Sequence, residues 1–163
     1  MLIVKDAMVL IHLAKANLLE KSCDYFKNII IPPLVREEAT RSDYPDARLI
    51  QDLIGQAKIR VETIKDKTLL FKAHQFNLQR GEAEAVALYW EKKAELLATD
   101  DDNVRKKKML LQLAIIGTPS ILLQLYKKKK IDQRQLKEAI KVLKETAWFS
   151  NMVWDKIIME AER

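Results

Sequence analysis

Cysteine, long hydrophobic runs and repeated segments are scarce or missing in this chain of 163 residues. Cys23 is the only cysteine, so an internal disulfide and a cysteine-rich zinc site are both excluded. A lone cysteine is also typical of proteins from a reducing, intracellular environment. No stretch approaches the ~20 apolar residues of a membrane span, and neither a repeat nor a low-complexity linker divides the sequence.

The apolar segment at the N-terminus is short as well. Lys5 and Asp6 interrupt it and no basic region precedes it, so it lacks the pattern of a signal peptide. We therefore expect a cytoplasmic protein that does not associate with membranes.

The composition is that of a folded protein with an excess of positive charge. Apolar residues make up 48% and charged residues 32% of the chain, and the net charge is +6. The positive charge is compatible with a polyanionic partner such as nucleic acid. It supports such a partner only if a binding or catalytic site for nucleic acid is also present. The length suits one domain, which we place at residues 1–163.

Apolar, β-branched segments alternate along the chain with segments of helical periodicity. The predicted strands are residues 1–4, 28–31, 58–64, 95–99 and 114–118, and the predicted helices are residues 7–22, 33–41, 46–57, 67–77, 82–94, one from about 103, and two or three from Pro119 onward. Alternation of this kind implies parallel strands joined by right-handed crossovers. We predict an α/β protein with three layers (α/β/α), a parallel sheet of four or five strands and a helical C-terminal extension at 120–163.

Acidic residues follow two of the predicted strands. Asp6 comes directly after the first strand, and Asp100–Asp102 come directly after the fourth. Ligands of open parallel sheets bind beyond the carboxyl ends of the strands, where the strand order reverses. If the first and fourth strands are neighbours, these acids meet there. Glu38, on the sheet-facing side of its helix, and Glu82, at a helix start, would reach the same edge.

Several carboxylates in one cleft need a neutralising cation or protonation, because each close pair at ~4 Å costs about 1 kcal/mol in water and about 4 kcal/mol near a protein surface. Oxygen ligands without cysteine or clustered histidine favour a hard ion, Mg²⁺ or Mn²⁺. Such ions activate water and hold the scissile phosphate in phosphodiester hydrolysis. The basic run Arg105, Lys106, Lys107 and Lys108 would then bind the polyanionic substrate.

Four segments contain these acids: LIVKDAMVLIHLAK at 2–15, IPPLVREEA at 31–39, GEAEAVALYW at 81–90 and LLATDDDNVR at 96–105. In this order they resemble the four acidic motifs of the PIN-domain nucleases. AIIGTPSILLQLYKKKKI at 114–131 and WFSNMVWDKII at 148–158 resemble the C-terminal part of a prokaryotic branch of that family. The resemblance implies a metal-dependent ribonuclease related to the VapC-type toxins, which leave a 5′-phosphate and a 3′-hydroxyl.

The resemblance assigns catalytic roles to Asp6, Glu38, Glu82 and Asp101. Asp6 and Asp101 would bind the metal directly, and Glu38 and Glu82 directly or through water. Asp100 is a further candidate metal ligand, because it lies next to the acid that the T-x-D pattern selects. Glu84 is the alternative third acid, since two residues on a helix point about 200° apart and only one can reach the metal.

Several residues near these motifs have simpler structural interpretations. Asp102 could cap the next helix, Thr118 could cap the helix that begins near Pro119 or bind phosphate, and Lys127–Lys130 could be a solvated helix end. His12 and His74 are expected to be packed or surface histidines with no acid placed beside them. Trp148, Phe149 and Trp154 are expected to dock the last helices, together with Leu136, Ile140 and Leu143.

Three functional hypotheses follow. The first is a metal-dependent endoribonuclease acting on single-stranded or structured RNA, for which the toxin role in a toxin–antitoxin pair, an antitoxin partner and a homodimer are candidates. The second is a non-catalytic RNA-binding or scaffold protein on the same fold. The third, a phosphate-handling switch of the receiver type, expects a Lys-Pro pair after the fifth strand, and the sequence has none there.

Overall fold

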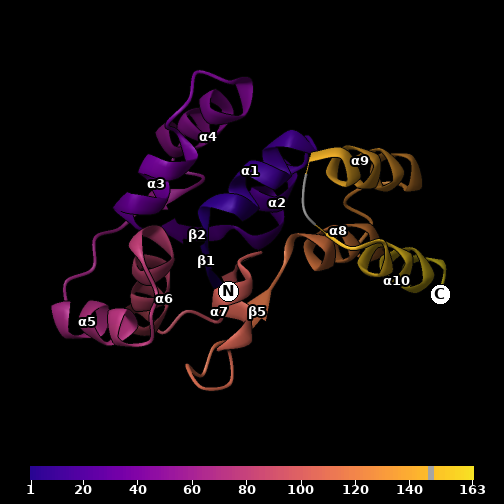
Figure 1. The fold of residues 1–163 in the computed structure, drawn as a ribbon. Coiled ribbons are helices and arrows are strands. Elements are labelled where there is room, and N and C mark those ends of the chain that lie inside the picture. The colour runs from indigo at the N-terminus through magenta and orange to yellow at the C-terminus, as the bar shows by residue number, and fades with distance from the viewer. Residues whose placement is uncertain (147–148) are drawn as a thin grey trace.

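A computed structural model describes residues 1–146 and 149–163 of the chain. Trp148, expected to help dock the last helices, lies outside the described residues. Figure 1 shows the fold and labels most of the elements. They are β1 (Leu2–Lys5), α1 (Ala7–Lys15), α2 (Leu19–Phe26), β2 (Asn28–Ile31), α3 (Pro33–Ala39), α4 (Pro45–Gly55), β3 (Arg60–Val61), α5 (Lys67–Gln75), α6 (Arg80–Lys92), β4 (Leu96–Ala98), α7 (Asp102–Lys106), β5 (Ile115–Ile116), α8 (Thr118–Lys127), α9 (Gln133–Thr146) and α10 (Asn151–Glu162).

The five strands form one parallel sheet with the order β3-β2-β1-β4-β5. The central strand is β1, where Ile3 pairs with Ile29 of β2 on one side and with Leu96 of β4 on the other. Ile3, Val4 and the three isoleucines of β2 are fully buried, as expected for a sheet covered on both faces. The predicted α/β class, with a parallel sheet of four or five strands, is confirmed.

The direction of the chain across the sheet reverses once. β1, β2 and β3 proceed toward one edge, whereas β4 and β5 proceed from β1 toward the other. Because crossovers are right-handed, this reversal puts α1 to α4 on one face and α5 to α7 on the opposite face. Figure 1 shows these two groups on opposite sides of the strands, and α6 contacts β1 and β4. The reversal lies between β1 and β4, where ligands of such sheets bind.

The helix predicted at 7–22 is instead two helices, α1 and α2. The chain turns at Asn17, whose φ of 59° lies in the left-handed region. The Leu18 N–H donates to Leu13 O at 2.9 Å, a bond of the kind that closes a helix C-terminus. Asparagine tolerates this conformation better than most residues. Asn17 therefore marks the break between the two helices, although the apolar periodicity continues across it.

Both edge strands are shorter than predicted. β3 and β5 each contain two residues, against the predicted ranges 58–64 and 114–118. Each pairs with a single neighbour, so fewer hydrogen bonds define its length than define β1.

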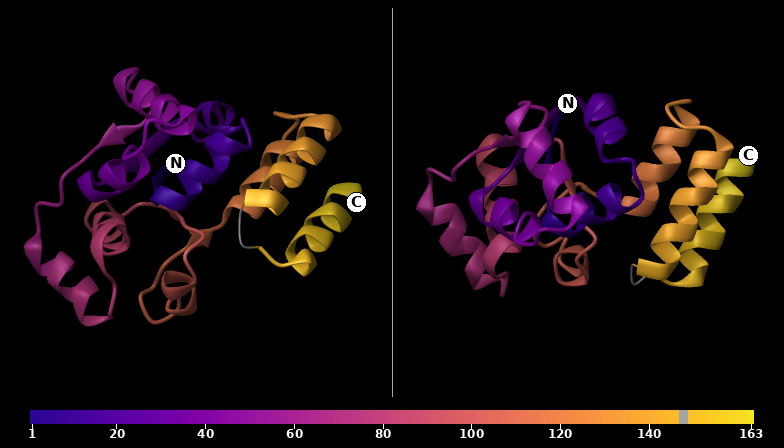
Figure 2. Two further views of the ribbon diagram at one scale, coloured as in Figure 1. Left: turned by 45° about the horizontal axis from the view of Figure 1, so that its top comes forward. Right: turned by 90° about the horizontal axis from the view of Figure 1, so that it is seen from above.

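The last three helices form a C-terminal helical unit, which we define as residues 118–146 and 149–162. Figure 2 shows α8, α9 and α10 running side by side at one end of the molecule. The unit contacts the rest of the protein through α8 against α1 and α2, and through α9 against α1. Within it Leu136, Ile140, Leu143 and Trp154 are buried, as expected. Among the described residues, no helix combines the length and the apolar character needed to cross a membrane.

Lys5 is the last residue of β1 and is fully buried. The predicted strand, residues 1–4, ended before it. Its ammonium group donates to the Ser22 hydroxyl and lies 5.4 Å from the centre of the Phe26 ring, both on α2. Burial lowers the pKa of Lys5 to about 8, because the charged form loses its hydration. The buried lysine and the neighbouring Asp6 thus place two ionisable groups at the end of the central strand.

Candidate active site

The pairing of β1 with β4 places Asp6 beside the acidic run. Lys5 pairs with Ala98, and the Asp6 N–H donates to Ala98 O at 2.9 Å. The two strands therefore end together, and the residues that follow them, Asp6 and Thr99–Asp101, lie at one edge of the sheet. The condition under which the sequence would bring these acids together, adjacent first and fourth strands, is met in the structure.

Four carboxylates from four segments line one pocket of about 430 Å³ at this edge. Asp6 follows β1, Glu38 belongs to α3, Glu82 to α6, and Asp101 precedes α7. The other residues of the lining are Ala7, Met8, Ile11, Arg41, Gln79, Arg80 and Gly81. The structure thus brings together the four acids that the motifs selected, although they lie up to 95 residues apart in the sequence.

Thr99 connects the two acids at the strand ends. Its hydroxyl donates to Asp6 Oδ2 at 3.2 Å and accepts from the Asp101 N–H at 3.1 Å. Thr99 is fully buried, so neither bond competes strongly with water. The T-x-D spacing was a signal for Asp101, but the role of the threonine itself became apparent only in the structure.

Asp101 also caps a helix. Its Oδ1 accepts from the Val104 N–H at 3.0 Å, and Asp101 is the N-cap residue of α7. The expectation that Asp102 would provide this cap is wrong, because Asp102 is already the first helical residue. One oxygen of Asp101 is therefore held by the backbone, which orients the carboxylate toward the pocket.

Glu38 meets the start of α6 at Gly81. Glu38 Oε1 accepts from the Gly81 N–H at 2.8 Å. A Cβ atom at Gly81 would overlap that oxygen. Any side chain at this position would therefore displace the Glu38 carboxylate from its present place, whereas glycine lets it approach the backbone.

The two candidates for the third acid point to different places. Glu82 lines the pocket, and its Oε1 accepts from Gln79 N at 3.0 Å and from Asn103 Nδ2 at 3.2 Å. Glu84 Oε1 accepts from the Leu34 N–H at 2.9 Å, at the start of α3. Glu82 is thus both a lining residue of the pocket and part of a capping box at the start of α6.

Two of the four acids, Asp6 and Glu82, have pKa values raised chiefly by burial. Burial raises the pKa of Asp6 from 3.8 to about 7, and the charges of Asp101 and Glu38 add to the effect. Burial also raises the pKa of Glu82, with a further contribution from Asp101. Each shift means that the folded protein holds the ionised acid less favourably than water does, so the pocket favours a bound cation or proton.

Asp100 lies next to Asp101 but is not part of the pocket lining. Its carboxylate accepts hydrogen bonds from Thr118, and His12 Nδ1 lies 2.8 Å from Asp100 Oδ2. The expectation that no acid would lie beside His12 is therefore wrong. His74 Nδ1, in contrast, lies 3.0 Å from the backbone Leu78 O.

The basic run Arg105–Lys108 lies on and after α7. Lys107 Nζ donates to the backbone Phe76 O at 2.7 Å, whereas Arg105, Lys106 and Lys108 are at least partly exposed. Among the described residues, the pocket is lined by two other cations, Arg41 and Arg80, and by none of this run. Sequence reasoning missed both arginines, because neither belongs to a charged cluster.

The donor set of the pocket suits a hard divalent ion, because its acidic ligands are four carboxylates and neither histidine nor cysteine lines it. Within residues 1–146 and 149–163, no group of three or more Asp, Glu, His or Cys side chains is already spaced to hold a metal ion. Burial, with a smaller contribution from neighbouring carboxylates, raises the pKa values of Asp6 and Glu82, and a bound cation would favour their ionised forms. The residues therefore fit the ion in their chemistry and charge, and their side chains would have to close around it.

The sheet order and the position of the pocket define an α/β protein with an acidic cleft at its strand reversal. The model of a protein family described as a PIN domain matches residues 2–163. The chain belongs to the PIN-domain family, as the resemblance of the four motifs predicted. No match was found among curated proteins, and none among solved structures.

Replacing Asp6 by asparagine is expected to stabilise the metal-free protein at neutral pH. Since the pKa of Asp6 rises from 3.8 to about 7 on folding, the folded state binds more protons between these values and stability falls as pH rises through them. Asp6→Asn removes this effect and should raise the free energy of unfolding at pH 7.5 by about 1–3 kcal/mol. Urea unfolding in EDTA at pH 4.5 and 7.5 measures it.

The exposed Asp43 provides the matched control. Asp43→Asn should change the free energy of unfolding equally little at both pH values. An Asp6→Asn effect that is the same at pH 4.5 and 7.5 would contradict the assigned pKa.

Proposed function

We propose that the protein is a metal-dependent endoribonuclease whose active site is the pocket between β1, α3, α6 and α7. The observation that carries the proposal is the convergence of Asp6, Glu38, Glu82 and Asp101 on one cleft at the strand reversal. Membership of the PIN-domain family supports it, since that family generally consists of nucleases.

The four acids divide into two pairs by their surroundings. Asp6 and Asp101 share the Thr99 hydroxyl and are proposed to hold the ion directly. Glu38 and Glu82 are each bonded to backbone N–H groups around the start of α6 and are proposed to hold it directly or through water. Mg²⁺ or Mn²⁺ bound there would neutralise the carboxylates and activate water for attack on a phosphodiester.

Arg41 and Arg80 are proposed to bind the RNA backbone at the mouth of the pocket. Both are exposed at the surface and line the same cleft as the acids. Guanidinium groups bind phosphate through paired hydrogen bonds, and here they would offset the charge of the acids during RNA binding. Arg105, Lys106 and Lys108 are proposed to extend the contact along α7.

The non-catalytic RNA-binding protein is the second candidate. It shares the basic residues but requires no metal, so metal-dependent cleavage separates the two. The antitoxin partner, the homodimer and the cytoplasmic localisation stay predictions from the sequence.

Cleavage of end-labelled RNA in Mn²⁺, Mg²⁺ or EDTA tests the proposed function. The wild type should cut only with metal, and Asp101→Asn and Glu82→Gln should each lower the rate about 100-fold or more, because each removes a charged ligand. Glu84→Gln is the matched control, because the amide oxygen can still accept from the Leu34 N–H. Equal, metal-independent products from all variants would favour the binding protein, and loss of activity in Glu84→Gln alone would reassign the third acid.

Gly81→Ala should disable the site without unfolding the protein. The new Cβ displaces the Glu38 carboxylate, so cleavage should fall about 10- to 100-fold. The free energy of unfolding should change by less than ~1 kcal/mol, because alanine favours the helix. Gly55→Ala is the control, since no atom lies within 4 Å of its added Cβ. Equal activity of the two variants would contradict the role of Glu38.

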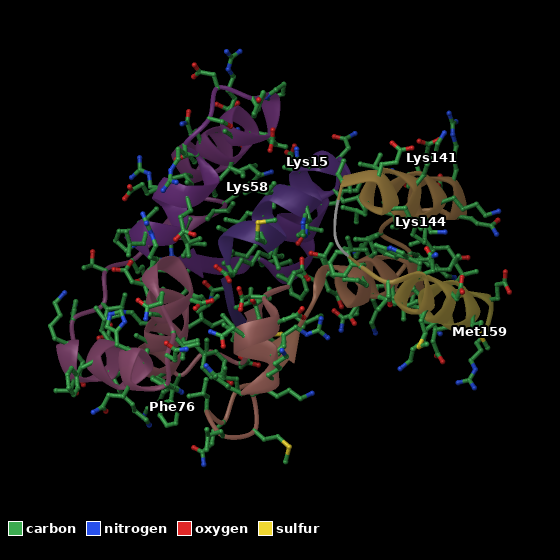
Figure 3. All side chains as sticks on the ribbon, viewed as in Figure 1. Lys15, Lys58, Phe76, Lys141, Lys144 and Met159 are labelled. Carbon is green, nitrogen blue, oxygen red and sulfur yellow. The ribbon has the colours of Figure 1, made fainter. Side chains whose placement is uncertain are left out.

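The salt dependence of RNA binding distinguishes the two groups of cations. Removing one phosphate contact should lower the slope of log affinity against log salt by about 0.7 for single-stranded RNA. We expect this change for Arg41→Ala and Arg80→Ala, and test Arg105→Ala beside them. Lys141→Ala is the control, because Figure 3 shows Lys141 on α9 in the C-terminal helical unit. An unchanged slope in both pocket variants would exclude their contact with phosphate.

A further inference from the structure

A buried polar network surrounds Asp100, outside the pocket. Thr118 donates to both oxygens of Asp100, through its backbone N–H to Oδ1 at 2.7 Å and through its hydroxyl to Oδ2. His12 Nδ1 lies 2.8 Å from the same Oδ2. The side chains of His12 and Asp100 are only 6% and 4% exposed, and Thr118 is fully buried. Both carboxylate oxygens therefore already have partners inside the protein.

The network joins three elements that are distant in sequence. His12 belongs to α1, Asp100 to the turn between β4 and α7, and Thr118 is the first residue of α8. A buried carboxylate is stable only when hydrogen bonds replace its hydration, and Asp100 obtains these bonds from the other two elements. The start of the C-terminal helical unit is thereby fastened to the acidic turn.

Aromatic contacts extend the network to the last helix. The His12 ring packs edge to face with Phe149, with ring centroids 5.5 Å apart. Phe149 packs in the same manner against Trp154 of α10, at 5.3 Å, and Trp154 is fully buried. A continuous row of packed side chains therefore runs from Asp100 to α10.

The residues on both sides of Asp100 belong to the candidate site. Thr99 connects Asp6 to the Asp101 backbone, and Asp101 provides a carboxylate to the pocket. Because Asp100 lies between them in one short turn, movement of its side chain is transmitted to both through the backbone.

We propose that Asp100 is a positioning residue and not a metal ligand. With His12 and Thr118 it couples the docking of the C-terminal helical unit to the placement of Thr99 and Asp101. The coupling is a property of the fold, while its consequence for RNA cleavage rests on the proposed function. It also replaces the expectation that Asp100 binds the metal.

Thr118→Val tests the coupling from the α8 side, because valine matches the shape of threonine without the hydroxyl. We expect faster amide hydrogen exchange at residues 99–104 in the metal-free, full-length variant, by about tenfold. Thr146→Val is the matched control, because that hydroxyl donates to Val142 O within α9 at 2.9 Å. Exchange at 99–104 that is unchanged in Thr118→Val would overturn the coupling.

Mn²⁺ binding, measured by electron paramagnetic resonance, tests whether Asp100 is a ligand. Asp101→Asn should weaken Mn²⁺ binding at least tenfold, while Asp100→Asn and Thr118→Val should remain within about threefold of the wild type. Asp100→Asn and Thr118→Val should each lower kcat by about tenfold with little change in KM. The variant that combines the two substitutions should have the same kcat as either one, because each substitution already breaks the network. Loss of Mn²⁺ binding in Asp100→Asn would overturn the proposal.

Hydrogen exchange tests the coupling, whereas Mn²⁺ binding and RNA cleavage test the proposed function, so the two can fail separately. If the wild type neither binds Mn²⁺ nor cuts RNA, the nuclease proposal fails, and hydrogen exchange still decides the coupling. If the wild type is active and Asp100→Asn and Thr118→Val keep its full kcat, the role in positioning is overturned.

Discussion

The hydrogen bonds between β1 and β4 are the constraint on which the site depends. They bring residues 5 and 98 into register at the centre of the sheet, at the one place where the strand order reverses. The turns that follow the two strands then have to pass the same point, and both contain acids. The helices α3 and α6 contact each other and bring Glu38 and Glu82 to the same point. A sheet with β1 and β4 apart would leave the same four acids on separate surfaces.

Burial of the acids, and to a smaller extent their mutual repulsion, opposes folding, and local hydrogen bonds partly offset this cost. Asp6 accepts from the Ala7 N–H, Asp101 caps α7, and Glu82 completes the capping box of α6. The structural and functional interpretations of these acids are therefore compatible. Asp101 and Glu82 each accept backbone hydrogen bonds through one oxygen, and the second oxygen of Asp6 accepts from the Thr99 hydroxyl. The raised pKa of Asp6 indicates that these bonds do not remove the whole cost, and the metal-free site remains a locally unfavourable arrangement of charge.

The site extends beyond the acids to residues that hold them. Gly81 leaves room for the Glu38 carboxylate at the start of α6. Thr99 forms hydrogen bonds with both Asp6 and Asp101. Asp100 appears in the sequence as one of three equivalent aspartates, but its three hydrogen-bonding contacts differ from those of either neighbour. Identical side chains in consecutive positions thus perform different tasks, because successive residues of a turn point in different directions.

The sequence by itself determined the α/β class, the parallel sheet and the family, because these follow from apolar periodicity and from motifs that are local in the chain. It also selected the four acids that line the pocket. Only the tertiary structure decided that Glu82, and not Glu84, lines the pocket, and that Arg41 and Arg80 line it too. It also showed that the first predicted helix is two helices separated at Asn17. The contacts of Asp100 with His12 and Thr118 were likewise apparent only in the structure. The physical reason is that side-chain direction at a helix start or in a turn, and every contact between segments distant in sequence, depend on packing that no local pattern encodes.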